Sequence, residues 1–242
     1  MLDMKPIDFL IAGMQKSGTT ALQSFLKQNP EIFMSETKEL HFFDKETRDW
    51  TNPNYDTYHQ NFVGATATQI RGEATPAYTY WPNSMERIAA YNPNMRMIIC
   101  LRDPTHRAFS HWAMRVSKGK ETLSFSEAIR EGRNRVSLGN GLRVFSYVER
   151  GFYAPQLRRA FDLFGRKNVH ILQQEDLLNN HSVEMDRIWN FLGVPSYLTE
   201  PSFVRPVAMA QNLPALSKTD QVFLNDLFAE DQSETRGLIQ GK

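Results

Sequence analysis

The sequence contains a single cysteine, and several other features that mark large classes of protein are also missing. Cys100 stands alone among 242 residues, so the chain cannot form an internal disulfide and gives no sign of an oxidising compartment. No apolar run approaches the ~20 residues that a membrane-spanning helix needs. The histidines, the cysteine and the acidic residues show no zinc-like spacing. The net charge of +1 argues against a nucleic-acid binder.

The remaining composition is that of an ordinary globular protein. Hydrophobic residues make up 41% of the chain and charged residues 23%. An apolar run at 9–12 is not followed by a small-residue cleavage pattern, so we expect no signal peptide and a cytoplasmic location. At this length we expect one domain over residues 1–242.

Short apolar runs alternate with helical patterns along the chain. Runs typical of buried strands cover residues 7–12, 96–101 and 169–173. Helical spacing of apolar residues is seen at 20–28, 82–91, 103–116, 155–164 and 183–192, with further helix starts at Ser124 and Ser217. This alternation predicts an α/β fold, a central, mostly parallel sheet flanked by helices. Ligands of such sheets bind beyond the carboxyl ends of the strands.

A glycine loop lies between the first strand and the first helix. Gly13 and Gly18 keep the G-x-x-x-x-G spacing of phosphate-binding loops, in which helix-start N–H groups bind an anion. A magnesium-nucleotide loop requires Lys and then Ser or Thr after the second glycine. Thr19 and Thr20 occupy those positions, and the lysine, Lys16, lies inside the loop. The pattern predicts a P-loop-like site for a phosphate ester, without magnesium-assisted transfer of a terminal phosphate.

Arg102 follows the second apolar run, where a magnesium-nucleotide enzyme would carry an acid to hold the metal. A guanidinium at that place suits a second phosphate. Ser110 lies eight residues further on, about two helical turns, so its hydroxyl can join Arg102 on one anion. The alternatives are an ion pair for Arg102 and a plain helix-surface hydroxyl for Ser110.

Five motifs occur in an order typical of one known family. They are QKSGTT at 15–20, KELHFF at 38–43, GEATPAY at 72–78, LRDPTHRAFSHW at 101–112 and GFY at 151–153. In this order they resemble the sulfotransferases that use 3′-phosphoadenosine 5′-phosphosulfate (PAPS), most closely the glycosaminoglycan-type and bacterial branch. The resemblance covers about residues 5–195.

The resemblance implies a role for each matched residue. Lys16 would contact the 5′-phosphosulfate and the loop would cradle the 5′-phosphate, while Arg102 and Ser110 would hold the 3′-phosphate. PAPS is thus the implied cofactor, with adenosine 3′,5′-bisphosphate (PAP) as its product and no metal. The implied cofactor-binding set is Lys16, Ser17, Gly18, Thr19, Thr20, Arg102 and Ser110.

The segment at 38–43 would supply the acid–base chemistry. Sulfuryl transfer is an in-line displacement that needs a fixed cation at the leaving oxygen, here Lys16, and a base for the acceptor proton. Glu39 matches the family's general base, and His41 matches a histidine near the same centre. In an extended segment the two side chains would point to one side. The choice of base between them stays open.

Two departures from the family pattern bear on function. Ala74 stands where many glycosaminoglycan-type enzymes have lysine, and the later basic phosphate loop is reduced to Arg205 in the segment 203–207. We predict transfer of a sulfuryl group to a hydroxyl or amine of a glycan or small-molecule acceptor. The alternatives are a phosphate-loop kinase, a non-catalytic nucleotide-binding module and an inactive or truncated relative. The sequence identifies neither the acceptor nor the oligomeric state.

Overall fold

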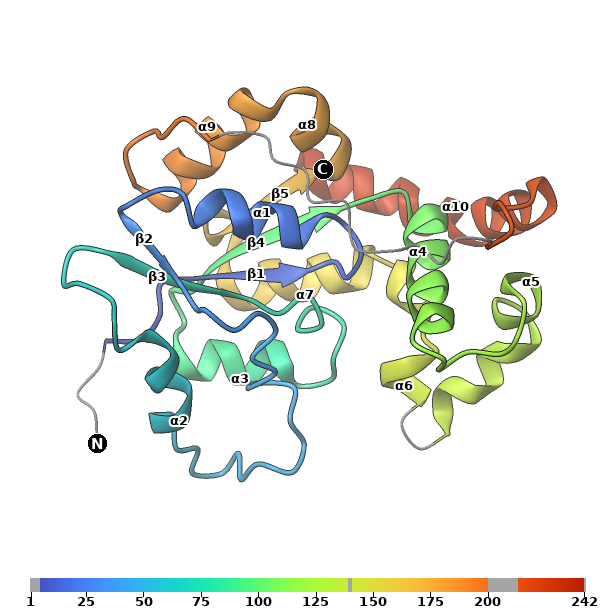
Figure 1. Cartoon of the computed structure of the whole chain (residues 1–242), viewed down its shortest axis with the longest axis horizontal. Coiled ribbons are helices and arrows are strands. Elements are labelled where there is room, and N and C mark those ends of the chain that lie inside the picture. Colours follow the sequence, from blue (N-terminus) through green and yellow to red (C-terminus); the bar gives the residue numbers. More distant parts are fainter. Residues whose placement is uncertain (1–4, 139–140, 200–212, 242) are drawn as a thin grey trace. The chain divides into compact units, whose positions relative to one another are not determined.

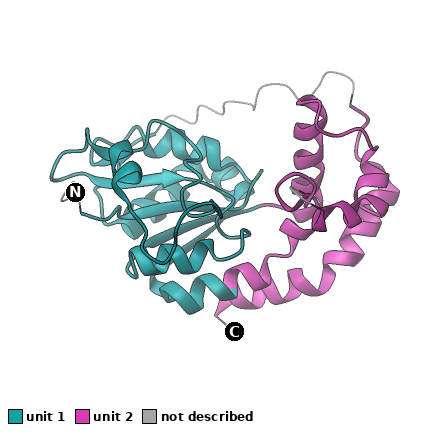
Figure 2. Cartoon of the chain, turned by 90° about the horizontal axis from the view of Figure 1, so that it is seen from below, with its two compact units in different colours: residues 1–101, 158–203 teal, residues 102–157, 204–242 magenta. Residues whose placement is uncertain are grey.

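The computed structural model describes residues 5–138, 141–199 and 213–241. The chain divides into two compact units, which Figure 2 shows in different colours. Unit 1 comprises residues 1–101 and 158–203, and unit 2 comprises residues 102–157 and 204–242. Unit 1 contains the β-sheet, whereas the described part of unit 2 consists of helices and loops.

Unit 1 is built around a five-stranded sheet (Figure 1) with the order β2-β3-β1-β4-β5. Every neighbouring pair is parallel, which confirms the predicted sheet. The structure adds two strands that the sequence did not predict, because β2 is very short and β3 carries Arg71 and Glu73 in place of an apolar run. The strands are β1 (Phe9–Gly13), β2 (Ile32–Met34), β3 (Ile70–Ala74), β4 (Arg96–Leu101) and β5 (Val169–Gln173).

Helices cover both faces of this sheet (Figure 1), as the α/β pattern predicts. One face carries α1 (Thr19–Leu26), α8 (Gln174–Asn179) and α9 (His181–Leu192), and the other carries α3 (Ser84–Tyr91) and α7 (Ala154–Phe164). On the first face, Ile11 of β1 and Ile98 of β4 belong to one apolar core with side chains of α1 and α9, which include Phe25, Leu26, Ile188 and Trp189. The shorter elements of unit 1 are α2 (Asp56–His59), η1 (Gln60–Phe62) and η4 (Arg166–Asn168).

The carboxyl ends of the strands meet at one edge because the strands are parallel. β1 leads into the glycine loop there, and β4 ends beside it, since the Met14 N–H donates to the Cys100 carbonyl oxygen at 2.8 Å. The turn after β3 reaches the same place, where the Thr79 N–H donates to the Ala12 carbonyl oxygen at 3.2 Å. β1 lies between β3 and β4, so the strand order reverses at this loop, which is where α/β sheets bind ligands.

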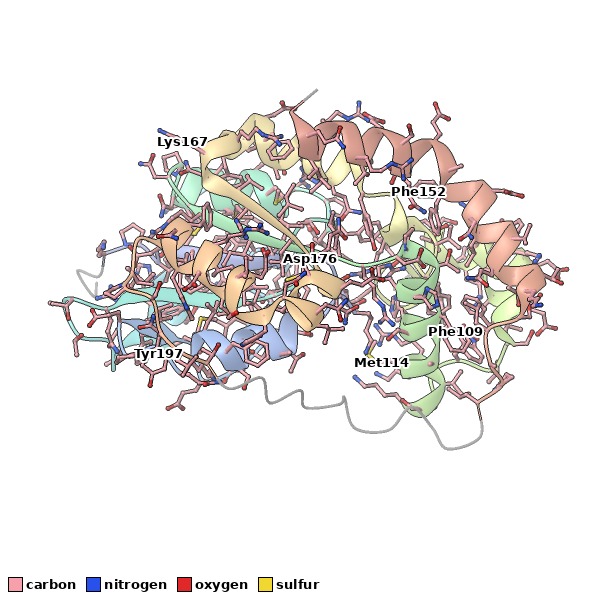
Figure 3. All side chains as sticks on the ribbon, turned by 90° about the horizontal axis from the view of Figure 1, so that it is seen from above. Phe109, Met114, Phe152, Lys167, Asp176 and Tyr197 are labelled. Carbon is pink, nitrogen blue, oxygen red and sulfur yellow. The ribbon has the colours of Figure 1, made fainter. Side chains whose placement is uncertain are left out.

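Unit 2 packs its helices around a second apolar core. α4 (Pro104–Ser117) begins at the predicted cap, where the Asp103 carboxylate accepts the His106 N–H at 2.8 Å. Phe109 is labelled on α4 in Figure 3, and the centre of its ring lies 5.1 Å from the centre of the Phe125 ring. The predicted capping box at Ser124 is also present. The remaining elements are α5 (Phe125–Ala128), η2 (Glu131–Ser137), α6 (Gly141–Val144), η3 (Glu149–Gly151) and α10 (Lys218–Gln240).

Candidate functional site

The glycines of the loop after β1 are required by close contacts and by the backbone. A Cβ atom at Gly13 would lie 2.6 Å from the Thr79 hydroxyl oxygen, closer than real Cβ contacts allow. Gly18 caps α1 in the left-handed region, with φ 87°, where a side chain is strained. Lys16 also has a positive φ of 73°, which is uncommon for a residue other than glycine. The loop is therefore fixed in one strained shape that presents the lysine.

The start of α1 is open to an anion. Gly18 offers no side-chain cap, and the first turn contains no acidic residue. The Ser17 hydroxyl is fully buried and has no hydrogen-bond partner within the part of the chain that the structure describes. A buried hydroxyl without a protein partner needs a ligand or a water to satisfy it. Thr19 is buried and Thr20 exposed, so the first turn of α1 extends from the interior to the surface.

The segment that carries Glu39 and His41 is not extended, and the prediction that it is was wrong. Both residues lie in the left-handed region, with φ 59° and 50°. Contacts from the end of β3 hold them there. The Glu39 N–H donates to the Ala74 carbonyl oxygen at 2.9 Å, and the Phe42 N–H donates to the Tyr78 hydroxyl at 3.0 Å. Non-glycine residues keep this conformation only where the surroundings impose it.

Glu39 and His41 nevertheless meet, together with a third side chain. His41 Nε2 lies 3.5 Å from Glu39 Oε2, and His41 Nδ1 lies 2.7 Å from Asp44 Oδ2. The hydrogen bond to the buried Asp44, and then that to Glu39, raises the pKa of His41 to about 9. The imidazole is therefore protonated at neutral pH and donates to a carboxylate on each side. Asp44 was missed in the sequence, although a carboxylate three residues after a histidine would have been the signal.

Lys38 connects this segment to the phosphate loop. Its ammonium group hydrogen-bonds the Thr20 hydroxyl and lies 3.7 Å from Glu39 Oε1. Burial lowers the pKa of Lys38, while the neighbouring Glu39 acts in the opposite direction. Unit 1 thus brings the predicted catalytic carboxylate to the first turn of α1.

A buried carboxylate lies beneath the same segment. Glu73 is fully buried at the end of β3 and accepts hydrogen bonds from the hydroxyls of Tyr58, Thr75 and Tyr78 at 2.8–2.9 Å. Burial raises the pKa of Glu73 to about 7, and the hydroxyl donors only partly oppose this. Because Tyr78 also holds the Phe42 N–H, Glu73 anchors the strained segment from below. Tyr78 is therefore part of the core.

Replacing Glu73 by Gln is expected to change how stability depends on pH. The folded-state pKa of Glu73, about 7, lies above the ordinary 4.5, so the folded protein binds this proton more tightly than the unfolded chain does. Its contribution to stability is then present below about pH 4.5 and is lost as pH rises through 7. Gln does not titrate. The free energy of unfolding of the variant should therefore rise relative to that of the wild type between pH 5 and 8, by roughly 3 kcal/mol at most.

Urea unfolding of both proteins at pH 5 and pH 8 measures this difference. The exposed Glu175→Gln serves as the control and should follow the wild type. A Glu73→Gln stability curve parallel to that of the wild type would show that the carboxyl group is ionised throughout this range.

In unit 2, the predicted 3′-phosphate residues lie at the start of α4. Arg102 directly follows β4, and partial burial lowers the pKa of its guanidinium. Its carbonyl oxygen accepts the Tyr153 hydroxyl at 3.0 Å, so two of the five motifs meet here. Ser110 is half-buried on α4. Whether its hydroxyl and Arg102 share one anion stays a prediction, and the segment 203–207 lies outside the described residues.

The described residues form neither a metal site nor a membrane-spanning helix. Residues 5–138, 141–199 and 213–241 hold no group of three or more His, Cys, Asp or Glu side chains that could bind a metal ion. In those same ranges, each helix is too short or too polar to cross a membrane.

A family model and individual proteins match this chain. The model of the sulfotransferase domain family matches residues 6–220. Human heparan sulfate glucosamine 3-O-sulfotransferase 3B1 is 26% identical over 215 residues, covering 87% of this chain and 52% of that protein. The chain thus spans about half the length of the curated relatives it matches.

Solved structures show the same fold. A sulfotransferase from Alicyclobacillus acidocaldarius superposes with a TM-score of 0.84 at 28% identity, over 98% of this chain and 97% of that one. A mouse sulfotransferase complexed with PAP superposes with a TM-score of 0.58 at 13% identity, over 98% of this chain and 90% of that one. At that identity the second likeness concerns the fold alone.

Proposed function

The chain belongs to the sulfotransferase domain family, and on this basis we propose that it transfers a sulfuryl group from PAPS to an acceptor hydroxyl or amine. We propose further that both units form one sulfotransferase domain, because the family match runs through residues of each. PAPS supplies a sulfuryl group whose leaving group is a phosphate. The residues of this chain must therefore bind a phosphate ester and accept a proton.

The contact between Lys38 and Thr20 carries this proposal. Through Lys38, the Glu39 carboxylate lies near the start of α1, the place proposed for the 5′-phosphate. A nucleotide-binding module without catalysis has no need for a carboxylate there. A kinase would need a lysine directly after the second glycine and an acid after β4 to hold magnesium, and Thr19 and Arg102 occupy those positions.

The residues of the loop fit a 5′-phosphate. The unpartnered Ser17 hydroxyl and the uncapped N–H groups of α1 offer donors, and Lys16 offers a cation for the leaving oxygen. Arg102 and Ser110 keep the role of binding the 3′-phosphate, which the resemblance implies. Glu39 is proposed to take the acceptor proton, because the protonated His41 has no free lone pair for it. Asp44 holds the imidazolium in place.

A sugar hydroxyl is the proposed acceptor class. Relatives of this chain are named for 3-O-sulfation of glucosamine in heparan sulfate, and such an acceptor presents hydroxyl groups. The chain spans about half of those relatives, so the proposal extends to the chemistry of the acceptor and not to a particular glycan.

Nucleotide preference tests the proposed function. PAP is expected to raise the melting temperature by mass action, whereas ATP with magnesium should have little effect. Arg102→Ala should weaken PAP binding by about 1.5–3 kcal/mol, the value of a hydrogen bond to a charged group. Differential scanning fluorimetry with a PAP titration gives both results.

Arg158→Ala, at an exposed position, provides the control and should bind PAP as the wild type does. Equal stabilisation by PAP and by ATP with magnesium would overturn the proposal. Unchanged PAP affinity in Arg102→Ala would assign the 3′-phosphate to other residues.

A further inference from the structure

Lys38 occupies an unusual position for a lysine. Its ammonium group lies at the first turn of α1 against the Thr20 hydroxyl, and its side chain is only 25% exposed. The start of a helix carries a partial positive charge, which disfavours a cation. Burial adds a further cost and lowers the pKa of this lysine. The hydrogen bond to the Thr20 hydroxyl and the neighbouring Glu39 carboxylate at 3.7 Å offset these costs only in part, since the pKa of Lys38 remains lowered.

Lys38 shares its acidic neighbour with another cation. Glu39 lies 3.7 Å from the Lys38 ammonium through one carboxylate oxygen and 3.5 Å from the protonated His41 through the other. The positive end of α1 lies against Lys38 as well, at Thr20. An anion bound at this helix start would stabilise such an arrangement. Among the described residues, the buried Ser17 hydroxyl of the neighbouring loop has no hydrogen-bond partner, so it is available to a ligand or a water.

The two contacts of Lys38 indicate which part of the ligand it meets. Thr20 belongs to the turn proposed to hold the 5′-phosphate, and Glu39 is proposed to take the proton of the acceptor. In PAPS, the group that passes between a phosphate and an acceptor oxygen is the sulfuryl group. We propose that Lys38 binds the sulfuryl group and is a second catalytic cation in addition to Lys16. This inference rests on the proposed function.

The chemistry balances with Lys38 in this role. The acceptor oxygen forms a bond to sulfur as the bond between sulfur and the phosphate oxygen breaks. The acceptor proton passes to Glu39, and the electron pair of the broken bond stays on the phosphate oxygen, beside Lys16. Negative charge on the atoms around sulfur increases as the acceptor oxygen gives its proton to Glu39, and the Lys38 ammonium stabilises this charge while keeping its own proton.

A comparison of PAPS with PAP separates this role from a structural one, because PAP lacks the sulfuryl group. Lys38→Met keeps the length of the side chain and removes its charge. We expect it to bind PAPS about tenfold more weakly, to bind PAP within twofold of the wild type, and to lower turnover by roughly 10²-fold. Lys38→Arg should restore part of the PAPS affinity. Calorimetric titration with PAPS and with PAP, without acceptor, gives the affinities.

Lys45→Met is the matched control, since Lys45 lies exposed in the same segment, and it should behave as the wild type. If Lys38→Met weakens the binding of PAPS and of PAP equally, Lys38 is a phosphate ligand or has a structural role, and the inference is overturned. Unchanged affinity for both would overturn it as well. If the wild type binds neither nucleotide, the proposed function itself fails.

Discussion

Replacing Glu39 by Gln is expected to lower the turnover number by roughly 10²–10⁴-fold, while the affinity for PAP stays that of the wild type. Gln keeps the shape of the side chain and can still contact His41, but it cannot accept the acceptor proton. Affinity should hold because the proposed base contacts the acceptor and not the phosphates. Steady-state turnover with PAPS and an acceptor, together with a PAP titration, measures both quantities.

Two companion variants make this result specific. Glu36 is exposed and lies three residues before Glu39, so Glu36→Gln should leave turnover unchanged. His41→Asn should cost less than Glu39→Gln, because the imidazolium only orients the carboxylate. An active Glu39→Gln beside an inactive His41→Asn would make the histidine the base.

The pH profile provides a second criterion for the same choice. Asp44 and Glu39 raise the pKa of His41 to about 9, well above the ordinary 6.5 of a histidine. A histidine base would have to lose this proton first, so turnover would rise steeply from pH 7 toward pH 9. With Glu39 as the base, turnover should show no such rise. Turnover measured across this range with the wild type and His41→Asn separates the two.

Replacing Lys16 by Ala is expected to lower turnover by roughly 10²–10³-fold, the usual cost of removing one preorganised group that stabilises the transition state. The leaving phosphate oxygen gains negative charge as the bond to sulfur breaks, and Lys16 is the loop cation proposed to meet it. The fold should survive. Ala has the same Cβ as Lys, so the strain at the positive φ of 73° does not change.

The thermal unfolding curve of Lys16→Ala checks that the loop remains intact, and turnover under saturating PAPS gives the effect on chemistry. The exposed Lys27→Ala, at the far end of α1, is the control. Near-normal turnover in Lys16→Ala would show that this lysine is only a surface charge. Another group would then have to stabilise the charge on the leaving phosphate oxygen.

The elements predicted correctly are those whose signals are local. β4 coincides with its apolar run because a strand buried on both faces must be apolar almost throughout. β5, an edge strand that is only partly buried, also coincides with its predicted range 169–173. α4 and α10 begin where expected because the caps Asp103 and Ser217 bond N–H groups three residues later. The glycine loop was visible for a similar reason. Only glycine suits the approach of Thr79 to Gly13 and the left-handed backbone at Gly18.

The tertiary structure decided what depends on contacts between distant residues. β3 carries Gly72 and the ionisable Glu73, so its place in the sheet follows from pairing with β1 and β2 and not from its own pattern. The burial of Glu73 could not be predicted from the sequence either, because a carboxylate is stable in the core only when partners such as the hydroxyls of Tyr58 and Tyr78 hydrogen-bond to it.

The candidate site combines both kinds of information. The sequence by itself determined that a phosphate loop with an internal lysine is followed by Glu39 and His41. Only the fold decided that these two residues bend into the left-handed region, that Asp44 keeps His41 protonated, and that Lys38 reaches Thr20. Local propensity disfavours a positive φ in such residues, so the bend exists because β3 and Tyr78 impose it from a distance in the sequence.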